Sequence, residues 1–270
     1  MKFEKFDKLQ ENKLFISLNY VVTFLSLYFL FSKIATYDVS LNFDFGNSLI
    51  VVVLIFLSSI IQAIAWSYML SGKQDSIEIF SWLNSIIGKY FPFKIGIISK
   101  RIINKNKNFK SSTIFKNIIK ENIIILLVIL FLSLYLIIDL MFLILIFLLT
   151  VIILKYTVER KTFLSSLYYF IAEPVYILGL IVFLNFYIEG YILEIALIYM
   201  FSSLLSMFIT TAPAGFGVRE YLFITTCAYF NLESNENLLF VVLSFRLLIV
   251  ISDFLIYLSS YLYKINFKNK

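Results

Sequence analysis

Long apolar stretches follow one another along almost the whole chain, and polar residues collect in the short segments between them. We count eight such stretches, at about residues 14–34, 48–70, 122–138, 140–154, 163–184, 191–210, 212–230 and 238–262. Most are long enough for an α-helix to cross the ~30 Å hydrocarbon core of a bilayer, which takes about 20 residues. The pattern predicts an all-α integral membrane protein with about eight transmembrane helices.

The third and fourth stretches are short, and only Asp139 separates them. We interpret them as a tight helical hairpin. The alternative is one long tilted helix, but a helix of that length would span ~50 Å and overshoot the bilayer.

Composition removes the soluble alternative. Hydrophobic residues make up 61% of the chain and charged residues 15%, whereas a soluble domain has roughly 45–50% and about 25%. The N-terminal segment mixes lysines with acidic residues, and no small-residue cleavage site follows the first apolar stretch. We therefore expect residues 1–270 to form a single polytopic membrane domain that keeps its first helix.

The distribution of lysine and arginine predicts the orientation. With the N-terminus inside, the exterior loops are 35–47, the turn near Asp139, 185–190 and 231–237, and they contain no lysine or arginine. Because basic residues favour cytoplasmic loops, we expect a cytoplasmic (inner) membrane protein with both termini in the cytoplasm. The net charge of +6 is explained in this way without a nucleic-acid partner.

Residues 100–120 are the most basic segment, with no acidic residue before Glu121. We interpret this segment as a cytoplasmic loop whose charge orients the protein and attracts anionic lipid headgroups. A specific phosphate site or partner site in the same loop stays open.

Several kinds of chemistry are excluded by what the chain lacks. It contains one cysteine, Cys227, and no histidine, so no thiolate or imidazole cluster can hold zinc, haem or an iron–sulfur centre. No phosphate-binding Gly-x-x-x-x-Gly-Lys-Ser/Thr loop is present either. We expect no cofactor and no metal, and we interpret Cys227 as a small packing residue.

Two segments interrupt the apolar pattern with proline and glycine. Pro92 and Gly96 share the spacing Pro-x-x-x-Gly with Pro213 and Gly217. Interrupted backbone is tolerated at membrane depth only inside protein or beside a watery cavity, and paired interruptions can mark a transporter's substrate site. We predict that the two segments, which could be re-entrant, approach each other. Two ordinary cytoplasmic loops are the alternative.

Ionisable residues beside the second interruption support its interpretation as part of a substrate site. Arg219 and Glu220 begin an apolar helix, and Arg246 and Asp253 lie two turns apart within the last one. Charges in a membrane are costly and therefore usually paired and functional, and arginine's planar fork suits phosphate or carboxylate. We predict a buried Arg219–Glu220–Arg246 cluster. Ion pairs that only tie helices together, Glu220–Arg246 or Asp253–Arg219, are the alternative.

Glu173 and Pro174 lie in the middle of the fifth apolar stretch. A kinked helix with a carboxylate could line a cavity or take up a proton. A packed kink without function is equally compatible with the sequence.

The run Pro213-Ala214-Gly215-Phe216-Gly217-Val218-Arg219-Glu220, followed by an apolar helix and Ser244-Phe245-Arg246, resembles a family signature. It is similar to the late motif, roughly Pro-Gly-Gly-x-Gly-x-Arg-Glu, of the flippase-like transmembrane family, also called the lysylphosphatidylglycerol-synthase transmembrane region. The segment from Lys89 through Gly96 is similar to that family's early motif, roughly Tyr-x-Pro-Gly-x-x-Gly-Glu-x-x-Arg. Segment order and spacing agree from about residue 10 to 262.

The chain departs from the family motifs at three positions. Ala214 replaces the first glycine of the late motif, and Phe93 and Ile97 replace the glycine and the glutamate of the early one. Larger family members attach a soluble aminoacyl-transfer domain after the membrane region. Because none follows within these 270 residues, the resemblance implies lipid handling without lipid aminoacylation.

The resemblance implies a non-enzymatic translocase of an anionic phospholipid or a polyprenyl-phosphate-linked sugar. Envelope-biosynthesis proteins and a second copy of the chain are further partners to expect. Arg219, Arg246 and Lys94 would receive the anionic headgroup. The full set of candidate substrate-binding residues is Arg219, Glu220, Arg246, Pro213, Gly215, Gly217, Pro92, Lys94, Gly96, Asp253 and Glu173.

Two other functions remain open at this point. An integral-membrane glycosyltransferase that uses a polyprenyl-phosphate sugar would place acidic residues in the first exterior loop, where Asp38 and Asp44 lie. A non-catalytic scaffold for a glycan or lipid synthesis complex is the other.

Overall fold

The computed structural model describes residues 45–90, 95–103, 109–134, 159–208, 218–230, 232 and 236–268. Within them the chain forms eight α-helices, one 3₁₀ helix and no strand. The elements are α3 (Phe45–Ser71), α4 (Ser76–Ser85), η1 (Ile86–Tyr90), α5 (Ile95–Ile103), α6 (Ser111–Ser133), α8 (Arg160–Tyr187), α9 (Ile192–Phe208), α10 (Val218–Tyr229) and α11 (Glu236–Lys268). The predicted spans 14–34 and 140–154 and the Asp139 hairpin lie outside the described residues.

Three of the described helices are long and apolar enough to cross a membrane. They cover Gly46–Ser71 in α3, Arg160–Tyr187 in α8 and Phe240–Leu262 in α11. The apolar stretches 48–70, 163–184 and 238–262 predicted these helices. The prediction of an all-helical protein is thus confirmed for the described residues, and these three helices have the length and composition that a membrane span requires.

The predicted stretch 191–210 corresponds closely to α9, which covers Ile192–Phe208, whereas α6 and α10 differ from the expected spans. α6 begins at Ser111 rather than near residue 122, because buried Ile114, Ile118 and Glu121 recur at helical spacing and give its polar first half a packed face. α10 begins at Val218 and has 12 residues, so its described length of ~18 Å is shorter than the hydrocarbon core. The basic segment 100–120 is therefore largely helical, which corrects its interpretation as a loop.

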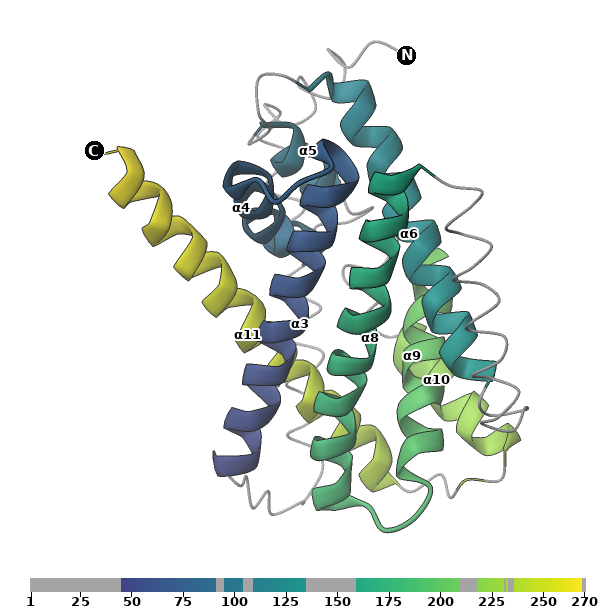
Figure 1. The fold of residues 1–270 in the computed structure, drawn as a ribbon. Coiled ribbons are helices and arrows are strands. Elements are labelled where there is room, and N and C mark those ends of the chain that lie inside the picture. Colours follow the sequence, from purple (N-terminus) through teal and green to yellow (C-terminus); the bar gives the residue numbers. More distant parts are fainter. Residues whose placement is uncertain are drawn as a thin grey trace, which may run out of the picture.

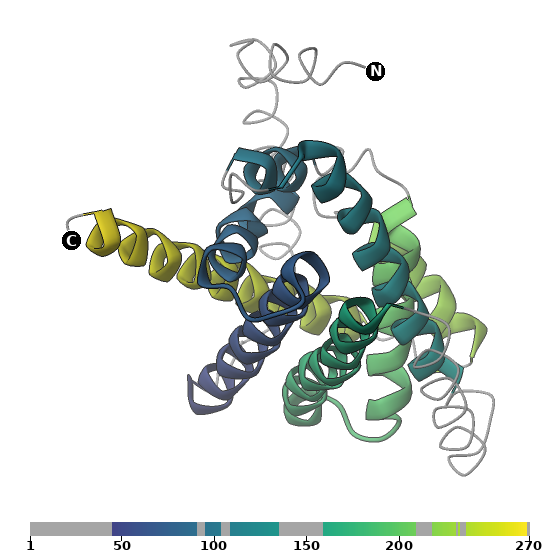
Figure 2. The ribbon, with the colours of Figure 1, turned by 45° about the horizontal axis from the view of Figure 1, so that its top comes forward.

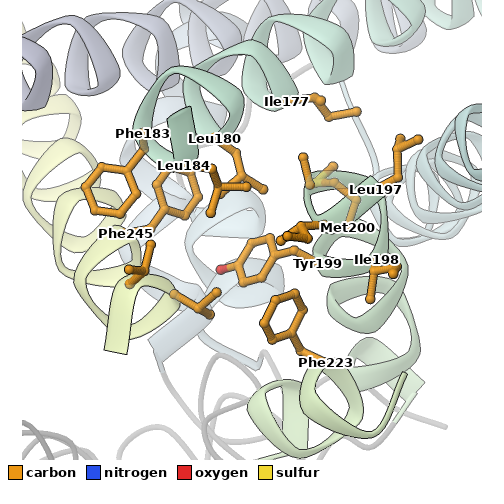
Figure 3. Packing of buried hydrophobic residues seen from close by; sticks show 14 of the residues in the cluster. Ile177, Leu180, Phe183, Leu184, Leu197, Ile198, Tyr199, Met200, Phe223 and Phe245 are labelled. Carbon is orange, nitrogen blue, oxygen red and sulfur yellow. The ribbon is translucent and has the colours of Figure 1, made fainter. Parts of the chain in front are cut away.

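α3 and α8 run side by side along the middle of the bundle, and α11 crosses behind them (Figures 1 and 2). The C-terminal part of α11 leaves the bundle. The largest core cluster joins α8, α9, α10 and α11, where Tyr199 lies among Phe183, Phe223 and Phe245 (Figure 3). The Tyr199 and Phe245 rings meet edge to face, with centroids 5.8 Å apart, a favourable aromatic geometry.

The outer faces of the long helices are apolar. On α3, Leu49, Val53 and Leu57 are exposed at four-residue spacing. On α11, large apolar side chains are exposed between Ile251 and Leu262. Continuous exposed apolar faces of this kind suit contact with lipid and would be unfavourable in water.

The first interrupted segment folds against the bundle through α4, η1 and α5. Asp75 caps α4 by accepting a 2.9 Å hydrogen bond from the backbone N–H of Ile77. A Cβ added to Gly88 would lie 2.3 Å from the backbone carbonyl carbon of Gly96, so η1 and the start of α5 touch backbone to backbone. The stretch Ser76–Ile87 buries Ser81, Trp82 and Ser85 among neighbouring helices.

Candidate functional site

α11 carries two buried ionisable residues on one face. Arg246 and Asp253 are seven positions apart, which is two helical turns or ~10 Å along the axis, and both side chains are buried. Among the described residues, α10, which follows the second interruption, provides an ion-pair partner of Arg246, and η1, which precedes the first, provides partners of Asp253. We call Lys89, Tyr90, Arg219, Glu220, Arg246 and Asp253 the α11 cluster.

One end of the α11 cluster is an ion pair between α11 and α10. Nη1 of Arg246 donates to Oε1 of Glu220, and both side chains are buried. Glu220 reaches Arg246 because α10 starts at Val218, which places it in the first turn of that helix. The Glu220–Arg246 contact expected from the sequence is present.

Arg219 joins this end through α9. Its Nη1 donates a 3.1 Å hydrogen bond to the Tyr199 hydroxyl, and its guanidinium carbon lies 5.6 Å from the centroid of the same ring. The charges of Arg219 and Arg246 are close enough to interact. The predicted gathering of Arg219, Glu220 and Arg246 is therefore found in the fold.

The other end of the α11 cluster holds Asp253. Its Oδ2 lies 2.5 Å from the Lys89 ammonium and accepts a 2.5 Å hydrogen bond from the Tyr90 hydroxyl. The expected alternative, an Asp253–Arg219 pair, is wrong among the described contacts. Two turns of helix carry Asp253 away from α10 and to the level of η1.

The two ends are also linked electrostatically. Burial raises the pKa of Tyr90 well above its usual value, the Asp253 carboxylate adds to this rise, and the Arg246 guanidinium lowers it. Tyr90 therefore interacts electrostatically with Asp253 at one end of the α11 cluster and with Arg246 at the other. Tyr176 on α8 lies between them as well, because it interacts with both Arg219 and Asp253.

The interruptions themselves are only partly described. Gly96 lies against Gly88 at the start of α5, whereas Pro92, Lys94, Pro213, Gly215 and Gly217 lie outside the described residues. The direct approach of the two Pro-x-x-x-Gly segments thus stays a prediction. Their described flanks, Lys89–Tyr90 and Arg219–Glu220, reach the same face of α11.

The charges of the α11 cluster do not cancel. Lys89, Arg219 and Arg246 contribute three positive charges, and Glu220 and Asp253 contribute two negative ones, which leaves one positive charge. A phosphate or carboxylate suits such a site, because charge-assisted hydrogen bonds to guanidinium are strong. Within the described segments no group of three acidic, cysteine or histidine residues could hold a metal ion.

A second buried ion pair lies in the segment first interpreted as a basic loop. Arg101 on α5 donates through Nη1 to Oε2 of Glu121 on α6, and through Nη2 to its Oε1 at 3.3 Å. The Trp82 indole N–H and the Tyr169 hydroxyl also donate to Oε1, at 2.7 and 2.9 Å. We call these residues the Glu121 network.

The guanidinium of Arg101 has two further contacts, with Ser85 and Trp66, and we include both residues in the Glu121 network. Nε of Arg101 donates to the Ser85 hydroxyl at 3.0 Å, and the guanidinium carbon lies 4.3 Å from the centroid of the Trp66 ring, a cation–π contact. The network therefore binds α3, α4, α5, α6 and α8 together. The interpretation of Arg101 as an orienting loop charge is corrected, because its charge is buried and paired.

Glu173 lies at the interface of α3 and α8, next to the internal Pro174 of α8. Its Oε1 accepts a 3.1 Å hydrogen bond from the side-chain amide of Gln62. One turn earlier on α3, the Ser58 hydroxyl donates to the carbonyl of Ala172. Glu173 is buried and does not contact the α11 cluster.

Sequence reasoning missed Lys89, Tyr90 and Tyr199 as site residues, and it missed the whole Glu121 network. One available signal was the rarity of arginine: the chain has four arginines against nineteen lysines. That signal favours Arg219 and Arg246 as site residues, and it applies equally to Arg101. The tyrosines carried no comparable signal among eighteen in the chain.

In comparisons with known proteins, no family model matches the chain, and no curated protein and no solved structure is significantly similar to it.

Proposed function

We propose that this protein is a lipid translocase that moves an anionic phospholipid or a polyprenyl-phosphate-linked glycan precursor across the cytoplasmic membrane. The observation that supports the proposal is the α11 cluster, in which six described residues gather three positive and two negative charges around the buried Glu220, Arg246 and Asp253. Buried ionisable groups among membrane-spanning helices are costly and typically mark a pathway for a polar substrate.

Access to the cluster favours a ligand that arrives from its Lys89 end. The Lys89 side chain is 30% exposed, whereas that of Asp253 is 2% exposed. A phosphate could replace Asp253 as the ion-pair partner of the Lys89 ammonium. The guanidinium groups of Arg246 and Arg219 would then attract the phosphate further into the protein. The lipid tails would stay against the apolar outer faces of α3 and α11.

The proposal requires arginine's geometry as well as its charge at position 246. In Arg246→Lys the ammonium keeps the positive charge beside Glu220, but it loses the planar fork that can hold two phosphate oxygens. We expect translocation to fall about tenfold, the equivalent of one ~1.4 kcal/mol interaction, while the thermal unfolding temperature changes little.

The measurement is the rate at which fluorescently labelled phosphatidylglycerol crosses the bilayer of proteoliposomes, followed by chemical quenching of the outer leaflet. Lys161→Met is the matched control, because Lys161 pairs with Glu159 on the surface. A wild-type protein no faster than empty vesicles would overturn the proposal. Full activity in the double variant Glu220→Arg with Arg246→Glu would show that the pair only joins two helices.

We further propose that the cytoplasmic side of the membrane holds both termini, as the distribution of basic residues favours. The loop between α8 and α9, with exposed Glu189, would then face the exterior. In a variant with Cys227→Ala, a cysteine at position 189 should react with an impermeant thiol reagent in intact cells, and a cysteine at Lys73 should not. The reverse labelling pattern would invert the orientation.

A further inference from the structure

Two glutamates lie close enough in the bundle for their charges to interact, but their surroundings differ. Glu121 receives donors from Arg101, Trp82 and Tyr169. Glu173 receives one hydrogen bond, from the neutral amide of Gln62. Among the described residues Glu173 forms no ion pair.

The groups that face Glu173 supply little to stabilise a negative charge. From α3 it meets the Gln62 amide, from α6 the Glu121 carboxylate, and within α8 the hydroxyls of Tyr169 and Tyr176. Further away, Tyr199 of α9, Arg219 of α10 and Asp253 of α11 interact with Tyr176, and Arg101 of α5 interacts with Tyr169 and is paired with Glu121. Among the described residues no cation forms an ion pair with Glu173 itself, and Glu121 repels a second negative charge.

A buried carboxylate without a cation loses its hydration and gains no ion pair, so its charged form is strongly disfavoured. The carboxyl group avoids this cost by keeping its proton. A neutral Glu173 can exchange hydrogen bonds with Gln62 in both directions, because the amide has a donor and an acceptor. Ionisation would remove one of these directions and place two negative charges near each other.

Because of where Glu173 lies, its protonation state affects the contact between α3 and α8. Ser58 and Gln62, one turn apart on α3, bind Ala172 and Glu173 of α8 in succession. Pro174 follows directly, and its ring removes the N–H that would donate to the carbonyl of residue 170. Because α8 lacks one backbone hydrogen bond at this point, it relies more on its hydrogen bonds with α3. A negative charge on Glu173 would therefore weaken the contact between α3 and α8.

We propose that Glu173 is a proton-binding site at the interface of α3 and α8, neutral in the folded protein near pH 7, and that loss of its proton loosens this interface. The site does not depend on the translocase proposal. Within a translocation cycle it would be the group through which a proton gradient acts, and only that extension rests on the proposed function.

The direct test is infrared spectroscopy of the wild-type protein and Glu173→Gln in lipid nanodiscs at pH 7. We expect the wild type to show a carbonyl band of a protonated carboxylic acid in an apolar environment, and we expect Glu173→Gln to lack it. Glu189→Gln, which changes an exposed glutamate, is the matched control and should keep the band. Identical spectra for wild type and Glu173→Gln would overturn the proposal.

A second measurement uses the pH dependence of thermal unfolding. The folded protein binds one proton more than the unfolded chain at pH values above the usual range of glutamate, so its stability falls as pH rises. Glu173→Gln cannot ionise, and it should unfold at a temperature close to wild type near pH 4 and at a higher temperature at pH 7. A constant difference, or a lower unfolding temperature at pH 7, would contradict the proposal whether or not the protein moves lipid.

Discussion

The Glu121 network and the α11 cluster are built from similar parts but differ in how completely each closes around its carboxylate. Each joins a buried carboxylate to a cation and to a tyrosine hydroxyl. In the Glu121 network both partners of the ion pair are almost fully buried, with 6% and 5% of their side chains exposed. In the α11 cluster the cation that holds Asp253 is 30% exposed.

This difference separates a structural ion pair from a site that a ligand can enter. The donors of the Glu121 network come from three helices, α4, α5 and α8, and converge on one carboxylate, and the guanidinium is covered by Trp66 and Ser85. An incoming anion would have to displace all of them. In the α11 cluster an anion would need only to replace Asp253 at the Lys89 ammonium, so we propose that the cluster binds the ligand and that the network holds the helices together.

Removing the charge of each carboxylate should give the largest contrast between the two regions. Glu121→Gln leaves the Arg101 guanidinium buried without a counter-charge, and we expect a loss of about 3–5 kcal/mol in the free energy of unfolding. Asp253→Asn should cost only about 1–2 kcal/mol, because the Lys89 ammonium can turn to solvent. Unfolding by sodium dodecyl sulfate titration in mixed micelles measures both.

Glu189→Gln is the control for this comparison, since its side chain is exposed and its effect should stay within about 0.5 kcal/mol. Equal losses for Glu121→Gln and Asp253→Asn would show that Lys89 cannot escape to solvent. The contrast between a closed network and an accessible cluster would then have no basis.

The two regions also differ in how far the sequence could predict them. Hydropathy alone predicts the parts of α3, α8 and α11 that are long and apolar enough to cross a membrane, because each is a long apolar run. The Glu220–Arg246 pair was predictable as well, because both residues stand within apolar surroundings where an isolated charge is too costly.

Neither Lys89–Asp253 nor Arg101–Glu121 could be found in this way. Tyr90 and Asp253 are 163 positions apart, and no local pattern connects such distant residues. Arg101 lies in a run of basic residues that charge rules assign to a cytoplasmic loop. Its burial depends on how α5 and α6 pack against Trp66 and Trp82, which is a property of the tertiary fold.

The smallest expected losses of unfolding free energy come from replacing Tyr169 and Tyr90 by phenylalanine. The two variants should differ in how their stability depends on salt concentration. Tyr169→Phe removes one of the donors to Glu121, and Tyr90→Phe removes one donor to Asp253. Each should cost only about 0.6–2 kcal/mol of unfolding free energy, as single hydrogen bonds do among membrane helices. After Tyr90→Phe, Asp253 depends on the part-exposed Lys89, whose attraction added salt screens. The free energy of unfolding of Tyr90→Phe should therefore fall further between low and high ionic strength. That of Tyr169→Phe should respond to salt as the wild type does, because Arg101 and Glu121 are both shielded from solvent. Parallel unfolding titrations at two salt concentrations measure this, and an equal salt response in both variants would mean that Lys89 is as enclosed as Arg101.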